Sequence, residues 1–363
     1  MEKVALNLDE VTPGMITAES IMPNEKQIIL QKNTELTGNI IALLKKWNIK
    51  SVYVKSRQPV IKQAKSSKTT QANLPRQNSS LSIFRRKYNH VSQLSQNIFD
   101  HIRTMEHLSY DLFCQLNAPV LYELLDEPHI LIRLYKLKPL INVTYRHAVN
   151  VGIIAGLIGR WCGFNEQTVQ NLILSGILHD VGKTQIPLKL LNKPASLTIE
   201  ERETIKLHPL YGFYLLKNIP DIFPGIQYAI LQHHERENGS GYPNGIASDT
   251  IHPFAKIIAI ADTYDALISE RFYRKGLTPF GALETLINEM FIQFDPAYCK
   301  VFIRNALQEL SKATVLLNDK TQADILYFPC FMSAKPTIKK PDGTSLDLNQ
   351  HPDIAIIDII KDE

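Results

Sequence analysis

The sequence predicts a mainly α protein in which an all-helical core lies between a small α+β module and a small β-rich appendage. Three observations predict this class. Apolar residues recur at three- and four-residue steps through the middle of the chain, short strand-like runs dominate its end, and a polar basic stretch interrupts it early. The predicted regions are an α+β regulatory module at 1–57, a basic flexible linker at 58–82, a helical connector at 83–140, the helical core at 141–310 and the β appendage at 311–363.

The first module is predicted from local signals. Residues 15–30 are expected to hold a strand pair that turns near Pro23-Asn24, followed by a helix at 38–47 with Thr37 as its N-cap and a closing strand at 52–54. No spacing there is typical of catalysis, so we expect regulation or packing.

The linker is set apart by its charge. Residues 57–87 hold eight Lys or Arg and no acidic residue. Removing these eight from the 40 basic residues leaves 32 against 36 acidic ones, so the rest of the chain is mildly acidic despite a formal net charge of +4. Such a polar stretch cannot bury enough apolar area to order itself, which favours a linker. The alternative, a basic arm for nucleic acid or anionic lipid, would need interleaved aromatics or amphipathic spacing, so we expect neither nucleic acid nor membrane as a partner.

The helical core carries clear start signals. Thr198 and Glu201 form a capping-box pattern, and Thr278-Pro279 and Asp295-Pro296 each place proline in a first helical turn. Short strand-like runs follow at 314–317, 325–328, 337–339, 346–348 and 354–357, separated by turn residues. We expect these strands to form a small barrel-like appendage.

Cysteine usage and hydropathy predict a cytoplasmic protein. The four cysteines are far apart and form no C-x-x-C pair, so neither a disulfide framework nor a thiolate metal site is expected. No apolar run approaches the roughly 18–20 residues that cross a bilayer, and the N-terminus lacks the apolar core of a signal peptide.

Six of the eleven histidines fall between His147 and His252. A single histidine on an apolar helix is more often a packed core residue than a ligand. Here, however, His179-Asp180 and Asp262 each follow an apolar stretch, and buried charges are costly unless they are paired or bound to metal. We therefore expect one cationic centre that collects His147, His179, Asp180, His208, His233, His234 and Asp262.

The composition of this set indicates the metal. It offers imidazole and carboxylate but no thiolate, which suits iron, manganese or another borderline divalent ion better than a structural zinc. Seven ligands exceed the needs of one ion, so two ions with a bridging carboxylate are expected. Two such ions activate a bridging water and stabilise both oxygens of an in-line phosphoryl displacement. The sequence thus favours hydrolysis of a phosphate ester.

Three cations near this set are candidates for holding a phosphate. Lys183 lies one turn after His179, and Arg271 and Arg274 follow Asp262 and are expected to project from the end of the same helix. Alone each would be an ordinary surface charge, but beside a metal cluster each can bind phosphate oxygens or a guanine edge. Residues 238–243, Asn-Gly-Ser-Gly-Tyr-Pro, must form a loop, which we expect at the rim of the site.

These residues resemble the HD-GYP family, a branch of the HD phosphohydrolases, over roughly 141–310. Seven ordered motifs carry the resemblance: Thr144-Tyr-Arg-His147, His179-Asp-Val-Gly-Lys183, Lys206-Leu-His208-Pro209, His233-His-Glu235, Gly239-Ser-Gly-Tyr-Pro243, Ala261-Asp262 through Leu267, and Arg271-Phe-Tyr-Arg274. Family members with a third metal carry Glu four residues before the first histidine, where this chain has Val143, so the resemblance implies two metals.

The resemblance implies a phosphodiesterase that hydrolyses cyclic di-GMP to linear pGpG, and in some members to GMP, by attack of a metal-bridging hydroxide. It implies that the seven residues named above are metal ligands, with Asp180 as the bridge, and that Asp180 and Lys183 are catalytic. Lys183, Arg271, Arg274 and Tyr242 would bind substrate. The Gly241-Tyr242-Pro243 loop would contact diguanylate cyclase (GGDEF) domains, and a homodimer is a further expected assembly.

Another class of function stays open. A receptor could keep the fold without catalysis and signal by binding a cyclic dinucleotide or a protein partner. The full ligand set favours the enzyme, because a receptor released from catalysis has no need of seven metal-binding groups.

Overall fold

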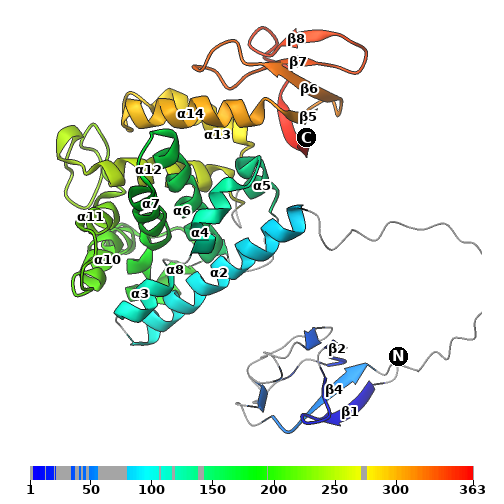
Figure 1. Cartoon of the computed structure of the whole chain (residues 1–363), viewed down its shortest axis with the longest axis vertical. Coiled ribbons are helices and arrows are strands. Elements are labelled where there is room, and N and C mark those ends of the chain that lie inside the picture. The colour runs from blue at the N-terminus through cyan, green and yellow to red at the C-terminus, as the bar shows by residue number, and fades with distance from the viewer. Residues whose placement is uncertain are drawn as a thin grey trace, which may run out of the picture. The chain divides into compact units, whose positions relative to one another are not determined.

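The computed structural model describes residues 3–12, 14–19, 21, 34–36, 41, 44–45, 49–55, 80–105, 108–116, 119–137, 143–193, 195–270 and 276–362 (Figure 1). The chain divides into two compact units, Met1–Leu74 and Pro75–Glu363. Most of the predicted linker, residues 58–79, lies outside the described residues, so its role stays a prediction.

The described part of the first unit holds two small antiparallel sheets, and most of the predicted helix at 38–47 lies outside the described residues. Strand β1 (Lys3–Asn7) pairs antiparallel with β4 (Ser51–Lys55), and β2 (Met15–Ile16) pairs with β3 (Glu35–Leu36). The partner of β2 therefore lies beyond the predicted pair at 15–30, and the predicted turn at Pro23-Asn24 lies outside the described residues. A two-residue strand such as β3 shows no alternation, which is why the pattern missed it.

The second unit is mainly helical, which confirms the predicted fold class. Its α-helices are α2 (Ser80–Met105), α3 (Tyr110–Leu116), α4 (Pro119–Glu123), α5 (Ile130–Lys136), α6 (Val143–Trp161), α7 (Glu166–Leu178), α8 (Leu188–Leu191), α9 (Ile199–Ile205), α10 (His208–Leu216), α11 (Pro224–Gln232), α12 (Pro253–Ile268), α13 (Pro279–Glu289) and α14 (Pro296–Leu310). Short 3₁₀ turns, η1 (Leu124–Asp126), η2 (Val181–Gln185) and η3 (Ser248–Thr250), join some of them.

The predicted helix starts are confirmed. Thr198 and Glu201 form the capping box of α9, with both of its hydrogen bonds present. Thr278 and Asp295 cap α13 and α14, and each of these helices has proline in its first turn. Such caps satisfy backbone N–H groups that the helix itself leaves without partners.

Helices α6 and α7 meet backbone to backbone through two glycines. A Cβ atom on Gly176 would lie 2.5 Å from the Cα atom and 2.6 Å from the nitrogen of Gly152. Helix α12 also packs against α6, α7 and α11. These four helices hold six of the seven candidate ligand residues close to one another, and α10, which packs against α11, carries the seventh, His208.

The last five strands form one antiparallel sheet, which confirms a small β appendage. They are β5 (Ala313–Leu317), β6 (Gln322–Tyr327), β7 (Thr337–Lys339), β8 (Ser345–Asp347) and β9 (Ile356–Asp362), in the order β8-β7-β6-β5-β9. Among the described residues β8 and β9 do not pair, so the sheet is open and the expected barrel-like closure is wrong. The apolar face of the sheet, with Val315 and Ile338 fully buried, joins the hydrophobic core of the helices, and this contact replaces closure.

Within the described part of the chain, no helix combines the length and apolar character needed to cross a membrane.

Candidate metal centre

The structure brings all seven predicted ligand residues to one place. They come from five positions in the fold, most of them at helix ends: His147 lies near the start of α6, His179 and Asp180 follow α7, His208 begins α10, His233 and His234 follow α11, and Asp262 lies within α12. Histidines at helix ends can turn toward a common centre without disturbing the apolar helix faces behind them. The sequence therefore predicted which side chains meet here.

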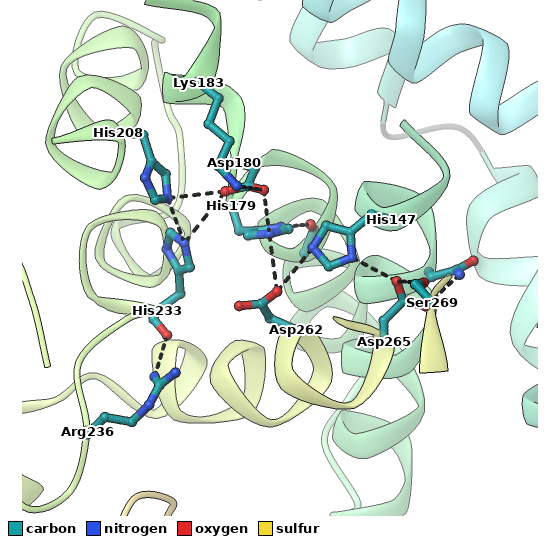
Figure 2. A network of polar contacts seen from close by, with 12 residues as sticks. His147, His179, Asp180, Lys183, His208, His233, Arg236, Asp262, Asp265 and Ser269 are labelled. Atoms are coloured by element: carbon teal, nitrogen blue, oxygen red, sulfur yellow. Dashed lines mark hydrogen bonds and ion pairs between the residues drawn. The ribbon is translucent and has the colours of Figure 1, made fainter. Parts of the chain in front are cut away.

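The donor atoms form two groups that share Asp180 (Figure 2). One group is His147, His179 and Asp180, and the other is Asp180, His208, His233 and His234; within each, the donor atoms lie within 4.8 Å of one another. The Oδ2 atom of Asp180 is 3.3 Å from His179 Nε2, and its Oδ1 atom is 3.2 Å from His208 Nε2. The two oxygens of one carboxylate thus face two different sets of imidazoles.

Asp262 lies against the two histidines of the first group. Its Oδ1 atom is 3.1 Å from His147 Nε2 and 3.9 Å from His179 Nε2. Two carboxylates and two imidazoles therefore surround one half of the centre, while three imidazoles and the shared carboxylate surround the other.

Backbone carbonyl groups fix the orientation of three imidazole rings. The Nδ1 atoms of His179, His208 and His233 lie 2.7 to 2.8 Å from the carbonyl oxygens of Gly176, Ile205 and Ile230, each three residues earlier. A carbonyl oxygen only accepts, so each Nδ1 carries the hydrogen and each Nε2 presents its lone pair to the centre. Metal-binding histidines are oriented in this way.

His147 is oriented by a carboxylate, which the sequence reasoning missed. Its Nδ1 atom is 2.7 Å from Oδ2 of Asp265, and the side chain of Asp265 is fully buried. The available signal was spacing, because Asp265 follows Asp262 by three residues on an apolar helix and so shares its face. Asp265 stood inside one of the quoted motifs without a role.

The protonation states of most of these donors suit cations. Burial and the neighbouring imidazoles push the pKa of His233 well below its usual range, and burial lowers the pKa of His234 to about 3. Burial raises the pKa of Asp180, but the charges of Lys183 and His179 outweigh it and bring the pKa well below its usual range. Neutral imidazole and ionised carboxylate are the forms that bind metal.

His147 differs. Burial lowers its pKa, but hydrogen bonds to Asp262 and Asp265 outweigh burial and raise the pKa to about 10. His147 Nε2 and Asp262 Oδ1 lie 3.1 Å apart, and a cation would find both atoms as donors there.

Two buried atoms at the centre also lack hydrogen-bond partners. Among the described residues, none forms a hydrogen bond with His179 Nε2 or with Asp180 Oδ1. Buried polar atoms are costly when left unsatisfied, and a metal ion would satisfy both of them. The residues present therefore fit a divalent metal centre.

Of the three predicted phosphate-binding cations, the structure describes one. The Lys183 ammonium lies 2.5 Å from Asp180 Oδ2, and its side chain is 31% exposed, so it is both at the centre and accessible. Helix α12 ends at Ile268. Arg271 and Arg274 come after this residue in the sequence, and both lie outside the described residues, so their position relative to the centre stays a prediction.

The predicted rim loop lies against His234. The ring of Tyr242 stacks on the His234 imidazole, with centroids 4.5 Å apart and an interplanar angle of 26°. Buried Glu235 holds the loop by accepting hydrogen bonds from the backbone nitrogens of Asn244 (2.7 Å) and Ile246 (3.1 Å). At Gly241 a Cβ atom would overlap with the Glu235 backbone, so only glycine fits this turn. No sequence pattern predicted this role for Glu235.

Gly182 allows the loop after Asp180 to contact α10. A Cβ atom there would overlap with the carbonyl oxygen of His208 and lie 2.5 Å from the nitrogen of Gly212. We expect Gly182→Ala to lower the free energy of unfolding by about 3 kcal/mol and the melting temperature by roughly 5–10 °C, because backbone atoms cannot move aside.

Thermal unfolding of the metal-free protein tests this expectation. Gly281→Ala is the control, because a Cβ atom there has only ordinary contacts of 3.5 Å or more. Equal melting temperatures for both variants would contradict the close contact at Gly182.

Helices of this part of the chain thus gather a His-Asp pair, further histidines and an Asp at one buried point. Residues 131–298 match the family described as HD domain. A solved HDG"Y"P protein from Bdellovibrio bacteriovorus superposes with a TM-score of 0.53 over 83% of this chain and 98% of that chain, and at 15% identity this likeness shows a common fold.

Two curated relatives extend the comparison. A cyclic di-GMP phosphodiesterase of Pseudomonas aeruginosa is 34% identical over 194 residues, which are 53% of this chain and 46% of that protein. A cyclic di-GMP phosphodiesterase of Borreliella burgdorferi is 26% identical over 86% of this chain and 84% of its own length. The chain spans less than half the length of the Pseudomonas relative. These matches make the chain similar to HD domains over residues 131–298 and to cyclic di-GMP phosphodiesterases over part or most of its length.

Proposed function

We propose that the protein is a metal-dependent phosphodiesterase that hydrolyses cyclic di-GMP to linear pGpG, with GMP as the alternative end product. The observation that carries the proposal is the position of Asp180, whose two carboxylate oxygens face two separate groups of imidazoles. This arrangement suits two divalent ions, iron or manganese, with His147, His179, Asp180, His208, His233, His234 and Asp262 as their ligands. The two relatives compared above are named for hydrolysis of this substrate.

The bound metals would supply Lewis acidity and a water activated at neutral pH. In the reaction the oxygen of a water molecule bonds to phosphorus, and the bond from phosphorus to the 3′-oxygen of the neighbouring ribose breaks. One proton of the water passes to that 3′-oxygen and the other to solvent. Repetition at the second phosphodiester would convert pGpG into two molecules of GMP.

The chain's own residues would hold the substrate. Lys183, at the Asp180 carboxylate, is placed to bind a non-bridging phosphate oxygen. Tyr242, stacked on His234, offers an aromatic face at the edge of the centre for a guanine ring. We also assign Arg271 and Arg274 to substrate binding, on the family motif alone.

The exposed side of the Gly241-Tyr242-Pro243 loop is our candidate surface for a GGDEF domain. A homodimer and a cytoplasmic address stay predictions from the sequence. We do not favour a receptor without catalysis, because the donor set for two metals is complete.

The test is metal analysis combined with product chromatography. Protein purified without oxygen and loaded with Mn²⁺ should hold close to two ions per chain and convert cyclic di-GMP to pGpG or GMP. A cyclic GMP–AMP dinucleotide, assayed in parallel, measures selectivity between purines. A fully loaded protein that leaves cyclic di-GMP intact would contradict the proposed function.

A further inference from the structure

A chain of buried hydrogen bonds runs from α2 to the candidate metal ligand His147. The Tyr88 hydroxyl on α2 lies 2.6 Å from Oδ1 of Asn150, and Nδ2 of Asn150 lies 2.6 Å from Oδ1 of Asp265. The other oxygen of Asp265 accepts from His147 Nδ1 at 2.7 Å and from the Ser269 hydroxyl at 3.2 Å, as Figure 2 shows for the His147 end.

The direction of every hydrogen bond in this chain is fixed by chemistry. The fully buried Asp265 carboxylate only accepts, so Asn150 must turn its NH₂ group toward Asp265 and its carbonyl oxygen toward Tyr88. Tyr88 then donates to that oxygen. With Asp265 as acceptor, the hydrogen of His147 stays on Nδ1, and its Nε2 atom faces Asp262 and the centre.

We propose that Tyr88 and Asn150 are positioning residues for His147 and act through Asp265, so that α2 sets the metal affinity of one half of the centre. The proposal rests on the proposed two-metal site. It assigns a function to a helix that contributes none of the seven predicted ligands.

A second contact of α2 supports this role. The guanidinium of Arg103 donates hydrogen bonds to the carbonyl oxygens of Lys183 and Ile186, both at 3.2 Å. The same helix therefore also fixes the turn that carries Lys183. Tyr88 in the first half of α2 and Arg103 in its last turn therefore both contact residues beside the centre.

Changes in the hydrogen bonds that link Tyr88 to Asp265 should affect metal binding only in the half of the centre that contains His147. His208 and His233 are oriented by backbone carbonyls of their own segments and do not depend on Asp265. A change at Tyr88 should therefore weaken one of two binding steps and leave the other unchanged. Loss of general stability would not produce that asymmetry.

The test is Mn²⁺ binding to the full chain, measured by competition with a chelator of known affinity. We expect Tyr88→Phe to weaken one binding step about three- to tenfold and Asp265→Asn to weaken the same step about ten- to a hundredfold. Tyr264→Phe is the matched control, because Tyr264 is equally buried, lies on α12 beside the site, and has no hydrogen-bond partner for its hydroxyl among the described residues. It should bind both ions within about twofold of the parent.

A double-mutant cycle tests whether Tyr88 acts on the metal centre through Asp265. If Tyr88 acts through Asp265, then Tyr88→Phe should add little to the effect of Asp265→Asn, whereas independent effects would add. Equal affinities for Tyr88→Phe and Tyr264→Phe, or additive effects in the cycle, would overturn the proposal. If the parent binds two ions and the asymmetry is seen but cyclic di-GMP is not hydrolysed, the proposed function fails and this inference stands. If the parent binds no second ion, both fail.

Discussion

Asp180→Ala is expected to abolish binding of both metal ions and to reduce hydrolysis by roughly 10³-fold or more. Among the described residues Asp180 alone belongs to both donor groups, so its loss is expected to weaken each half of the centre at once. The helical fold should survive, because α7 ends before this residue and keeps its apolar face. Metal content and circular dichroism on the same preparation measure the two effects separately.

Thermal unfolding adds a second readout. Mn²⁺ should raise the melting temperature of the parent, because it binds only the folded state, and should not raise that of Asp180→Ala. Asp249→Ala, which removes an exposed carboxylate on η3, should keep the full metal content. An Asp180→Ala protein that holds two Mn²⁺ ions at parental affinity would refute the assignment of Asp180 as the bridge.

Lys183→Ala is expected to keep both metals and the fold but to lose ten- to a hundredfold in kcat/KM for cyclic di-GMP. One charge-assisted hydrogen bond to phosphate contributes about 1.5–3 kcal/mol, which corresponds to that range. Metal affinity should be retained or increase, because the Lys183 ammonium competes with a cation for the Asp180 carboxylate. Steady-state kinetics and chelator competition on the same samples distinguish the two effects.

An exposed lysine close to Lys183 in the sequence provides the control variant. Lys189→Ala, on α8, removes an equal charge six residues later and should leave kcat/KM within about twofold. If Lys183→Ala also stays within twofold, Lys183 is an ordinary solvated charge, and the choice of a phosphate substrate loses its support from this residue.

The candidate ligands could be predicted because the residues next to them in the sequence indicate that they are buried. His179-Asp180 and Asp262 stand after apolar stretches that predict buried helices, and a buried charge demands a partner. The caps of α9, α13 and α14 were equally readable, since each depends on residues within one turn. Local signals of this kind need no knowledge of the tertiary structure.

The residues that hold the ligands could not be predicted in the same way. Tyr88 and Asn150 are 62 residues apart, and Asn150 and Asp265 are 115 apart, so their hydrogen bonds exist only after the helices have packed. Each of these side chains, taken alone, looks like an ordinary polar residue on a helix. The pairing of β2 with β3 and the open edges of the last sheet were missed for the same reason, because strand partners are chosen by tertiary packing.

The contact between Gly152 and Gly176 limits how far the distance between two candidate ligands, His147 and His179, can vary. His147 lies five residues from one glycine and His179 three residues from the other. The distance between these two imidazoles is therefore set by the van der Waals radii of main-chain atoms. A layer of side chains between the helices would let that distance vary, because side chains change rotamer and move thermally. Direct backbone contact leaves no such adjustable layer. Substitutions elsewhere in the core can therefore be accommodated without changing the distance between the two imidazoles.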